Sequence, residues 1–235
     1  YKGGFDCVAI YLRNNPESRF FSKKGLILGG SHSPSPLNSE AHQGDLSAVL
    51  LQNLNPLVNL IRVPKKPIIL MDEWESKIKA IVENTWNKDV NSLSGVPSWM
   101  LVLIKAVLKK TGREYLTDVW PNLEVFFHGG ISFEPYREQY KTLIPSNKMH
   151  YMETYNASEG FFGLQDDPTD SSLLMMPDYG IFYEFIPMNE VGNAHPTVLP
   201  LESVETGKNY AMVITTSGGL WRYQIGDTVR FTSLF

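Results

Sequence analysis

Residues 122–130 read NLEVFFHGG, a short apolar run that closes on two glycines. The same arrangement occurs at residues 24–30, which read KGLILGG. Apolar runs of this length, ended by turn residues, are typical of buried strands. Glycines directly after a parallel strand let the backbone approach a ligand at the carboxyl edge of the sheet. A plain tight turn is the alternative interpretation of Gly129-Gly130, and His128 in this position is more often packed than catalytic.

Helices and further strands are predicted between and after these two runs. Segment 72–86 has apolar residues at helical spacing and begins with Asp72, three residues before Glu75, as in a capping box. Segment 97–112 starts with proline, ends with glycine and is apolar nearly all round, as in a core helix. The Ser/Pro-rich segment 31–44 is predicted to be an irregular surface loop. The other predicted elements are helices in 44–54 and from 133–140, and strands in 90–99 and 148–155.

After residue 165 the pattern changes to short β-rich runs such as IFYEFIPM and YAMVITTSGGLWRYQIGD. Pro, Gly and Asn separate these runs, which is typical of antiparallel strands. We therefore expect an α/β fold, with a mixed sheet and flanking helices in residues 1–165. Residues 166–235 are expected to form a β-rich portion of the same domain.

The composition is that of an ordinary globular chain, with 235 residues, 43% hydrophobic content and 20% charged content. The net charge of −4, without blocks of like charge, argues against a nucleic-acid or membrane-surface binder but permits a nucleotide substrate. Cys7 is the single cysteine, which excludes an intrachain disulfide and suits a reducing cytoplasm. The first residue is not Met and the last residues read like the middle of a strand, so we expect the chain to be a fragment.

Residues 155–160 read YNASEG, directly after the predicted strand that ends the α/β region. A tyrosine ring can cover a planar base, and a serine hydroxyl can hydrogen-bond a phosphate oxygen. Glutamate is a hard oxygen ligand suited to Mg²⁺, which takes one or two protein carboxylates beside phosphate and water. A strand-to-helix turn capped by Ser158 is the alternative interpretation.

Residues 218–227 read GGLWRYQIGD. Gly226-Asp227 after a β run is most often a hairpin or a bend. A short acidic side chain held by such a bend can also accept hydrogen bonds from both hydroxyls of a ribose, as in dinucleotide sites.

Several familiar site patterns are absent from the sequence. It has no phosphate loop of the type GxxxxGK[ST], no GxGxxG, no GxSxG and no HExxH. The histidines are scattered and make no zinc pattern with one cysteine. A Cys-His nucleophile would have to use Cys7, whose apolar surroundings are more typical of a packed thiol.

In order and together, YNASEGFFG and GGLWRYQIGD resemble two signatures of the acyl acid–amido synthetase family first known from auxin-inducible plant genes (the Gretchen Hagen type). This family belongs to the adenylate-forming superfamily, and the resemblance covers nearly the whole chain. The first match is an aromatic residue, two variable residues and Ser158-Glu159. The second runs from Tyr223 to Asp227, with Gln224 where the family commonly has Arg. Segments such as GDLSAVL, SGVPSW and PNLEVFFHGG are similar to bacterial members.

The resemblance implies a role for each matching residue, with ATP and Mg²⁺ as cofactors. Tyr155 would stack on adenine, Ser158 would contact the α-phosphate and Glu159 would hold Mg²⁺. Asp227 would bind the ribose hydroxyls, and the backbone of Gly129-Gly130 would line the adenine. Val96, Trp99 and His128 would border the acyl pocket, and Arg222 would either orient its motif or serve structure alone.

The family's first signature, a Ser/Gly/Thr-rich phosphate loop, is absent here. The resemblance places it upstream of residue 1, and places the mobile C-terminal domain beyond residue 235. The expected fold is therefore part of an adenylate-forming N-terminal domain, and this part alone is expected to be inactive.

The implied reaction joins a carboxylic acid to an amine, usually an amino acid, through an acyl-adenylate. An acyl-CoA ligase, which shares the adenylation step but uses a thiol acceptor, is the near alternative. A non-catalytic nucleotide-binding relic and an interaction module without ligand are alternatives from other classes.

Overall fold

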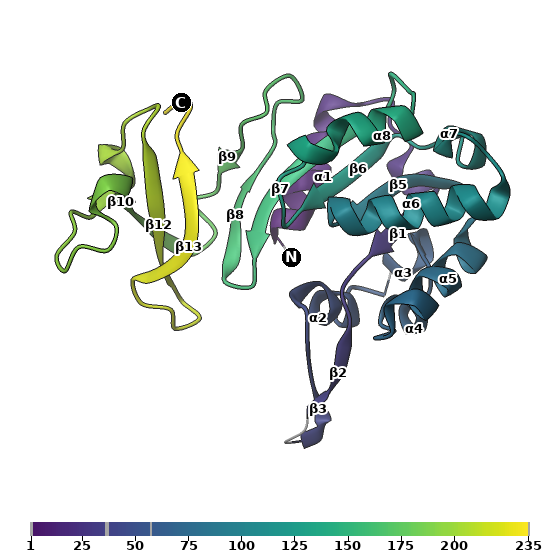
Figure 1. Cartoon of the computed structure of the whole chain (residues 1–235), viewed down its shortest axis with the longest axis horizontal. Coiled ribbons are helices and arrows are strands. Elements are labelled where there is room, and N and C mark those ends of the chain that lie inside the picture. The colour runs from purple at the N-terminus through teal and green to yellow at the C-terminus, as the bar shows by residue number, and fades with distance from the viewer. Residues whose placement is uncertain (1, 36–37, 57, 235) are drawn as a thin grey trace. The chain divides into compact units, whose positions relative to one another are not determined.

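The computed structural model describes residues 2–35, 38–56 and 58–234 and divides the chain into two compact units. The first unit contains residues 1–158 and 164–173, and the second contains residues 159–163 and 174–235. Figure 1 labels the elements of both units.

The first unit is built on parallel strands in the order β4-β1-β5-β6-β7. Their bounds are β1 Lys24–Leu28, β4 Arg62–Val63, β5 Val90–Gly95, β6 Val125–Gly129 and β7 His150–Ala157. Both predicted apolar runs that end in glycines, β1 and β6, are strands of this sheet. Because the strands are parallel, their carboxyl ends meet at one edge.

Helices follow or precede these strands. Their bounds are α1 Lys2–Asn14, α2 Leu46–Gln52, α3 Val58–Ile61, α4 Lys66–Ile69, α5 Trp74–Thr85, α6 Pro97–Thr111, α7 Leu116–Val119 and α8 Arg137–Leu143, with 3₁₀ turns η1 Phe20–Ser22 and η2 Glu134–Tyr136. The sequence predicted four of these helices, α2, α5, α6 and α8. α6 has Pro97 in its first turn and ends at Gly112, whose φ of 65° is left-handed. This confirms the predicted start and stop signals of α6.

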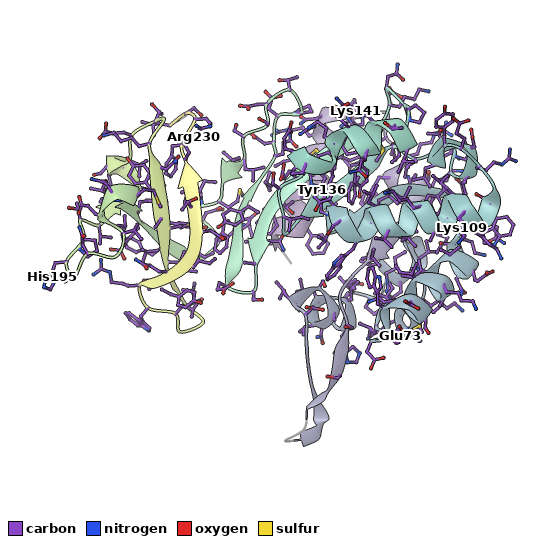
Figure 2. All side chains as sticks on the ribbon, viewed as in Figure 1. Glu73, Lys109, Tyr136, Lys141, His195 and Arg230 are labelled. Carbon is purple, nitrogen blue, oxygen red and sulfur yellow. The ribbon has the colours of Figure 1, made fainter. Side chains whose placement is uncertain are left out.

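The cap of α5 differs from the prediction. The N-cap is Glu73, which is labelled in Figure 2. Its carboxylate accepts hydrogen bonds from the backbone N–H groups of Glu75 and Ser76 at 2.9 and 2.6 Å. These contacts satisfy two of the donors that a helix start leaves free, and they lower the pKa of Glu73. Asp72 instead accepts from the N–H of Glu73. The predicted capping box at Asp72 is therefore wrong by one residue.

The predicted loop at 31–44 is also wrong where the structure describes it. β2 (His32–Ser35) and β3 (Asn38–Gly44) pair antiparallel, with His32 opposite Gly44. Residues 36–37 lie outside the described residues. The Ser/Pro-rich composition does not predict strands. These residues are strands because the two segments pair with each other, and local propensity does not predict such pairing.

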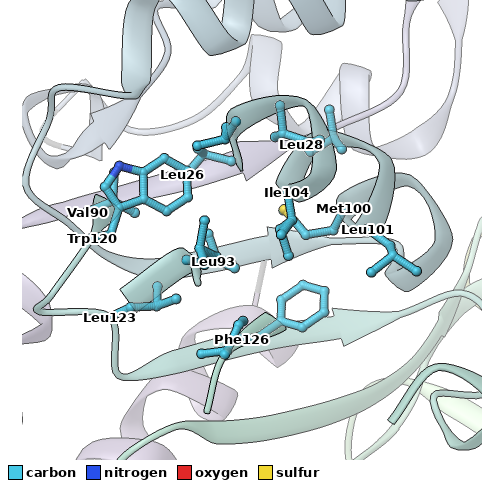
Figure 3. Close-up of a cluster of buried hydrophobic side chains, with 14 of the residues drawn as sticks. Leu26, Leu28, Val90, Leu93, Met100, Leu101, Ile104, Trp120, Leu123 and Phe126 are labelled. Carbon is cyan, nitrogen blue, oxygen red and sulfur yellow. The ribbon is translucent and has the colours of Figure 1, made fainter. Parts of the chain in front are cut away.

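The main core lies between the parallel sheet and α5, α6, α7 and α8 (Figure 3). Its buried side chains include Leu26, Leu28, Val90, Leu93, Met100, Leu101, Ile104, Trp120, Leu123 and Phe126. Fully burying one such side chain stabilises the fold by about 1.5–3 kcal/mol. One face of α6 is not buried, since Val102 on this helix is 47% exposed. α6 thus packs in the core as its nearly all-round apolar residues predicted, but it keeps one exposed face.

α1 packs on the opposite face of the parallel sheet (Figure 1). Tyr11 is buried and its ring lies 5.7 Å from the rings of both Phe127 and His150. Phe127 points to this face because neighbouring residues of a strand alternate. Cys7 is buried in the same helix, and burial raises the pKa of its thiol to about 12. Cys7 is thus the packed thiol that its apolar surroundings predicted.

The second unit contains an antiparallel sheet in the order β11-β10-β12-β13. The strands of this sheet are β10 Ile181–Pro187, β11 Leu199–Pro200, β12 Asn209–Thr216 and β13 Tyr223–Arg230, with 3₁₀ turns η3 Met188–Glu190 and η4 Leu201–Ser203. The strands β8 Gly160–Leu164 and β9 Leu174–Met175 follow β7 in the order of the first sheet. Buried Phe185 and Tyr210 pack against Phe231, with ring centroids 5.1 and 6.2 Å away. The predicted change to antiparallel β structure is confirmed.

Candidate functional site

The carboxyl edge of the parallel sheet gathers the predicted ligand-facing residues of the first unit. β1 ends before Gly29-Gly30, β5 ends at Gly95 before Val96, and β6 ends at Gly129 before Gly130. Open α/β sheets bind ligands outside the carboxyl ends of their strands. This edge is therefore the candidate site of the first unit.

Gly129 is required by close packing between two strands. Gly129 of β6 pairs in register with Thr154 of β7. A Cβ atom at Gly129 would lie 2.5 Å from the main-chain oxygen of Thr154 and 2.5 Å from its Oγ1. Gly130 is different, because its φ of 83° is left-handed and favours glycine directly. A Cβ at Gly130 would lie 3.5 Å from Cγ2 of Val96, so the structure brings these two predicted residues together.

His128 is packed inside the unit. Its side chain is 3% exposed, and its ring stacks on Phe133 with centroids 4.1 Å apart. Among the described residues, neither ring nitrogen has a hydrogen-bond partner. Burial, with a smaller effect of Arg137, lowers the pKa of His128 to about 3. His128 is therefore neutral near pH 7 and does not act there as a cationic group.

Trp99 lies in α6, where its ring packs against Trp74 of α5 with centroids 5.6 Å apart. It remains 36% exposed. This contact gives Trp99 a packing role between two helices, and the border of an acyl pocket remains a prediction for it.

Tyr155 lies in β7, and Ser158-Glu159 form the turn that leads from β7 into β8. The strand-to-helix turn capped by Ser158 is therefore wrong, because a strand follows. Ser158 is exposed and Glu159 is partly exposed, and no described residue makes a hydrogen bond or ion pair with either side chain. Both polar groups thus remain available to a ligand.

Asp227 of the second unit lies in β13 at an irregularity. The pairing of β12 with β13 shifts between Ala211 and Val213, so that extra residues of β13 bulge out. Gly226 within this bulge has a φ of 91°, which glycine adopts without strain. The predicted bend at Gly226-Asp227 is thus a β-bulge, which re-aims the exposed side chain of Asp227.

Arg222 begins this segment with a φ of 46°, the only positive value among the described non-glycine residues. Its Nε donates to Oε2 of Glu184 at 3.0 Å, and its backbone N–H donates to Oγ1 of Thr215 at 3.0 Å. These contacts hold Arg222 against β10 and β12. Both roles left open by the sequence, orientation of its motif and structure alone, stay predictions.

Two polar groups at the carboxyl edge were not found from the sequence. Lys77 of α5 is 1% exposed, and its Nζ donates to the main-chain oxygens of Gly29 and Gly30 at 2.7 and 2.9 Å. Burial lowers the pKa of Lys77, while the charge of Asp45 acts in the opposite direction. The sequence feature that could have predicted the burial of Lys77 is its position beside Ile78, which lies in the buried stripe of α5. The second group is Thr154. Apart from its position in the predicted strand β7, no sequence feature indicates its contacts with β6.

Two kinds of feature are absent from the part of the chain that the structure describes. None of the helices within residues 2–35, 38–56 and 58–234 is long and apolar enough to cross a membrane. In the same part of the chain, no three or more His, Cys, Asp or Glu side chains gather as a metal-binding group.

Comparison with known proteins gives the chain its relatives. It is 30% identical over 170 residues to indole-3-acetic acid-amido synthetase GH3.4 of Arabidopsis thaliana, which covers 68% of this chain and 27% of that protein. It is 37% identical over 128 residues to indole-3-acetic acid-amido synthetase GH3.8 of Oryza sativa subsp. indica, which covers 50% of this chain and 20% of that protein. The matched parts of the chain thus span about a quarter and a fifth of the lengths of these two relatives.

The solved structure of AtGH3.15 acyl acid amido synthetase in complex with 2,4-DB has the same fold, with a TM-score of 0.70 at 15% identity. The match covers 100% of this chain and 49% of that one. The predicted fold class is confirmed by this similarity.

Two family models match separate parts of the chain. Residues 1–149 match the GH3 family N-terminal domain, and residues 174–235 match the GH3 family central domain. The family predicted from the two motifs is thereby confirmed, and the chain belongs to the GH3 family.

Proposed function

We propose that the protein containing this chain joins a carboxylic acid to an amino acid through an acyl-adenylate made from ATP. The observation that carries this proposal is the carboxyl edge of the first unit, where Gly129 and Gly130 lie beside the strand that leads to Tyr155 and Ser158. Membership in the GH3 family and the amido synthetase relatives support it.

In the first step, a carboxylate oxygen of the acid attacks the α-phosphorus of ATP. The bond from that phosphorus to the bridging oxygen of pyrophosphate breaks, which leaves an acyl-adenylate. The residues of this chain bind and orient the nucleotide: Tyr155 stacks on adenine, the backbone of Gly129-Gly130 lines it, and the Ser158 hydroxyl donates to the α-phosphate. Asp227 accepts hydrogen bonds from the ribose hydroxyls.

In the second step, the nitrogen of an amine attacks the acyl carbon, AMP leaves with the electron pair of the broken bond, and the nitrogen loses a proton to solvent as the amide forms. His128 has no general-base role in this scheme, because its imidazole is buried and both nitrogens lie inside the packed aromatic cluster. The residues named here supply positioning rather than covalent chemistry.

The residues present fit a magnesium ion of the kind that accompanies ATP. Glu159 offers one partly exposed carboxylate without a hydrogen bond or ion pair to the described residues. The described residues offer no all-protein cage, and Mg²⁺ commonly uses one or two carboxylates beside phosphate and water oxygens. When bound, Mg²⁺ neutralises the charge that develops on the phosphates. Glu159 would hold it.

The test is ATP–pyrophosphate exchange by the complete gene product against a panel of indolyl, aryl and fatty carboxylic acids. Exchange that depends on one class of acid supports adenylation. Product analysis with amino acids in one arm and coenzyme A in the other then identifies the acceptor. Thioester formation without amide would replace the amido synthetase by an acyl-CoA ligase, and absence of exchange with every acid would contradict adenylation. A cytoplasmic location and a bacterial source belong to the same proposal, from the single cysteine and the resemblance.

A further inference from the structure

The side chain of Thr154 joins the two strands that carry the proposed adenine-binding groups. Its Oγ1 donates to the main-chain oxygen of His128 on β6 at 3.0 Å. The same hydroxyl lies 3.1 Å from Oδ1 of Asn156, so one hydrogen is placed between two acceptor oxygens. Hydrogen bonds between strands of a parallel sheet normally involve backbone groups alone, so this side-chain bond is an addition to the ladder.

The space for this bond exists because β6 has no side chain at the paired position. Gly129 is in register with Thr154, and Oδ1 of Asn156 lies 3.0 Å from the place of its missing Cβ. Polar atoms of Thr154 and Asn156 therefore fill the volume that a side chain at Gly129 would occupy. A side chain at Gly129 would therefore displace Thr154 and Asn156.

Alternation along β7 places Tyr155 on the face opposite to Thr154 and Asn156. On the face of Thr154 and Asn156, the Thr154 hydroxyl bonds β6, and Oδ1 of Asn156 accepts from the same hydroxyl. They leave the tyrosine ring on the other face.

We propose that Thr154 and Asn156 are positioning residues of the nucleotide site, which set the spacing between Tyr155 and Gly129-Gly130. This inference rests on the proposed function. An adenine ring must fit between groups on two strands, and small displacements of such groups weaken binding. Neither residue needs to touch the nucleotide for this effect.

The experiment measures the Kd of AMP by calorimetry on the complete gene product, well below the melting temperature of each variant. Thr154→Val keeps the shape of the side chain and removes the hydroxyl. We expect it to raise the Kd about tenfold, which is about 1.4 kcal/mol. Thr154→Ser restores the hydroxyl and is expected to bind AMP within about twofold of the wild type.

A matched control and a second variant separate an effect on nucleotide binding from a general effect of removing a buried hydroxyl. Thr85→Val removes a buried hydroxyl that donates to the main-chain oxygen of Ile81 at 2.7 Å within α5, and is expected to leave the Kd unchanged. Asn156→Ala, at a partly exposed position, is expected to raise the Kd several-fold even if Thr154→Val does not fold. Wild-type affinity in Asn156→Ala and in folded Thr154→Val would overturn this inference alone. Absence of AMP and ATP binding by the wild type would overturn the proposed function, and this inference with it.

Discussion

The hydroxyl of Tyr140 on α8 donates a hydrogen bond to the main-chain oxygen of Pro97, the first residue of α6, at 2.7 Å. Tyr140 is fully buried, and burial raises the pKa of its hydroxyl, so the group remains a donor at every physiological pH. This bond joins α8 to the start of α6, directly after Val96. It therefore connects the core of the first unit to the edge that carries the candidate site.

Tyr140→Phe is expected to lower the free energy of unfolding by about 1–3 kcal/mol, because the variant leaves a buried carbonyl oxygen short of a partner. Urea unfolding of both proteins measures the difference. Tyr136→Phe is the matched control, since its hydroxyl makes no hydrogen bond with the described residues (Figure 2). Equal losses in the two variants would mean that the bond between Tyr140 and Pro97 contributes nothing specific.

Because the imidazole of His128 is buried, we expect the free energy of unfolding to depend on pH below neutrality. Its pKa is about 3 in the folded protein and 6.5 in the reference state. Between these values the unfolded chain binds the proton and the folded chain does not. The free energy of unfolding therefore falls as the pH drops below 6.5, with a slope of up to about 1.4 kcal/mol per pH unit from this group.

Replacement of His128 by leucine removes this titration, so the loss of stability between pH 6.5 and pH 4.5 should be smaller in His128→Leu than in the wild type. Urea unfolding at several pH values measures both slopes. His195→Gln, at an exposed position (Figure 2), should keep the wild-type slope. Parallel curves for His128→Leu and the wild type would contradict the buried neutral imidazole.

Local signals predicted the elements that depend on neighbouring residues. The strand β6 and the helix α6 were found because apolar runs and the residues Pro97 and Gly112 act within a few positions. The cap at Glu73 was missed by one residue, since two adjacent acidic side chains offered the same chemistry. Which of them turns back on the helix depends on the backbone, and Glu73 has the extended φ and ψ of −78° and 117°.

Contacts between distant positions were beyond the sequence. β2 and β3 were assigned to a loop because their pairing, rather than their composition, makes them strands. Lys77 reaches a carbonyl 48 positions away, and Thr154 reaches one 26 positions away. A single sequence holds no sign of such partners. The motif that contains Ser158 and Glu159 was identified by resemblance, and local propensity alone left it equally compatible with a capped turn.

Glu159→Gln in the complete gene product is expected to reduce ATP–pyrophosphate exchange at least about a hundredfold, or about 3 kcal/mol of transition-state stabilisation. The amide keeps the size of the side chain but loses the charge that a hard cation requires. The affinity for AMP without Mg²⁺ should change little, because that measurement involves no metal. Glu202→Gln, exposed in η4, is the control and should exchange like the wild type. Exchange at the wild-type rate in Glu159→Gln would remove the metal-ligand assignment.

Asp227→Asn is expected to weaken the binding of both ATP and AMP by about tenfold to a hundredfold. The carboxylate can accept hydrogen bonds from two ribose hydroxyls, and a bond to a charged group contributes about 1.5–3 kcal/mol. Asparagine keeps the shape of the β-bulge after Gly226 but offers a single acceptor oxygen. Calorimetric titration with AMP measures the loss, and Glu205→Ala in the same unit should leave the affinity unchanged.

Deoxynucleotides separate a ribose contact from a general loss of structure around Asp227. In the wild type, 2′-deoxy-AMP and 3′-deoxy-AMP should bind more weakly than AMP, since each lacks one of the two hydroxyls that donate to the carboxylate. In Asp227→Asn this preference for AMP should shrink. Without the carboxylate, the loss of one ribose hydroxyl removes a weaker hydrogen bond and costs less affinity. A variant that binds all three nucleotides more weakly by the same factor would place the effect of Asp227 in the fold of β13, and the ribose assignment would be wrong.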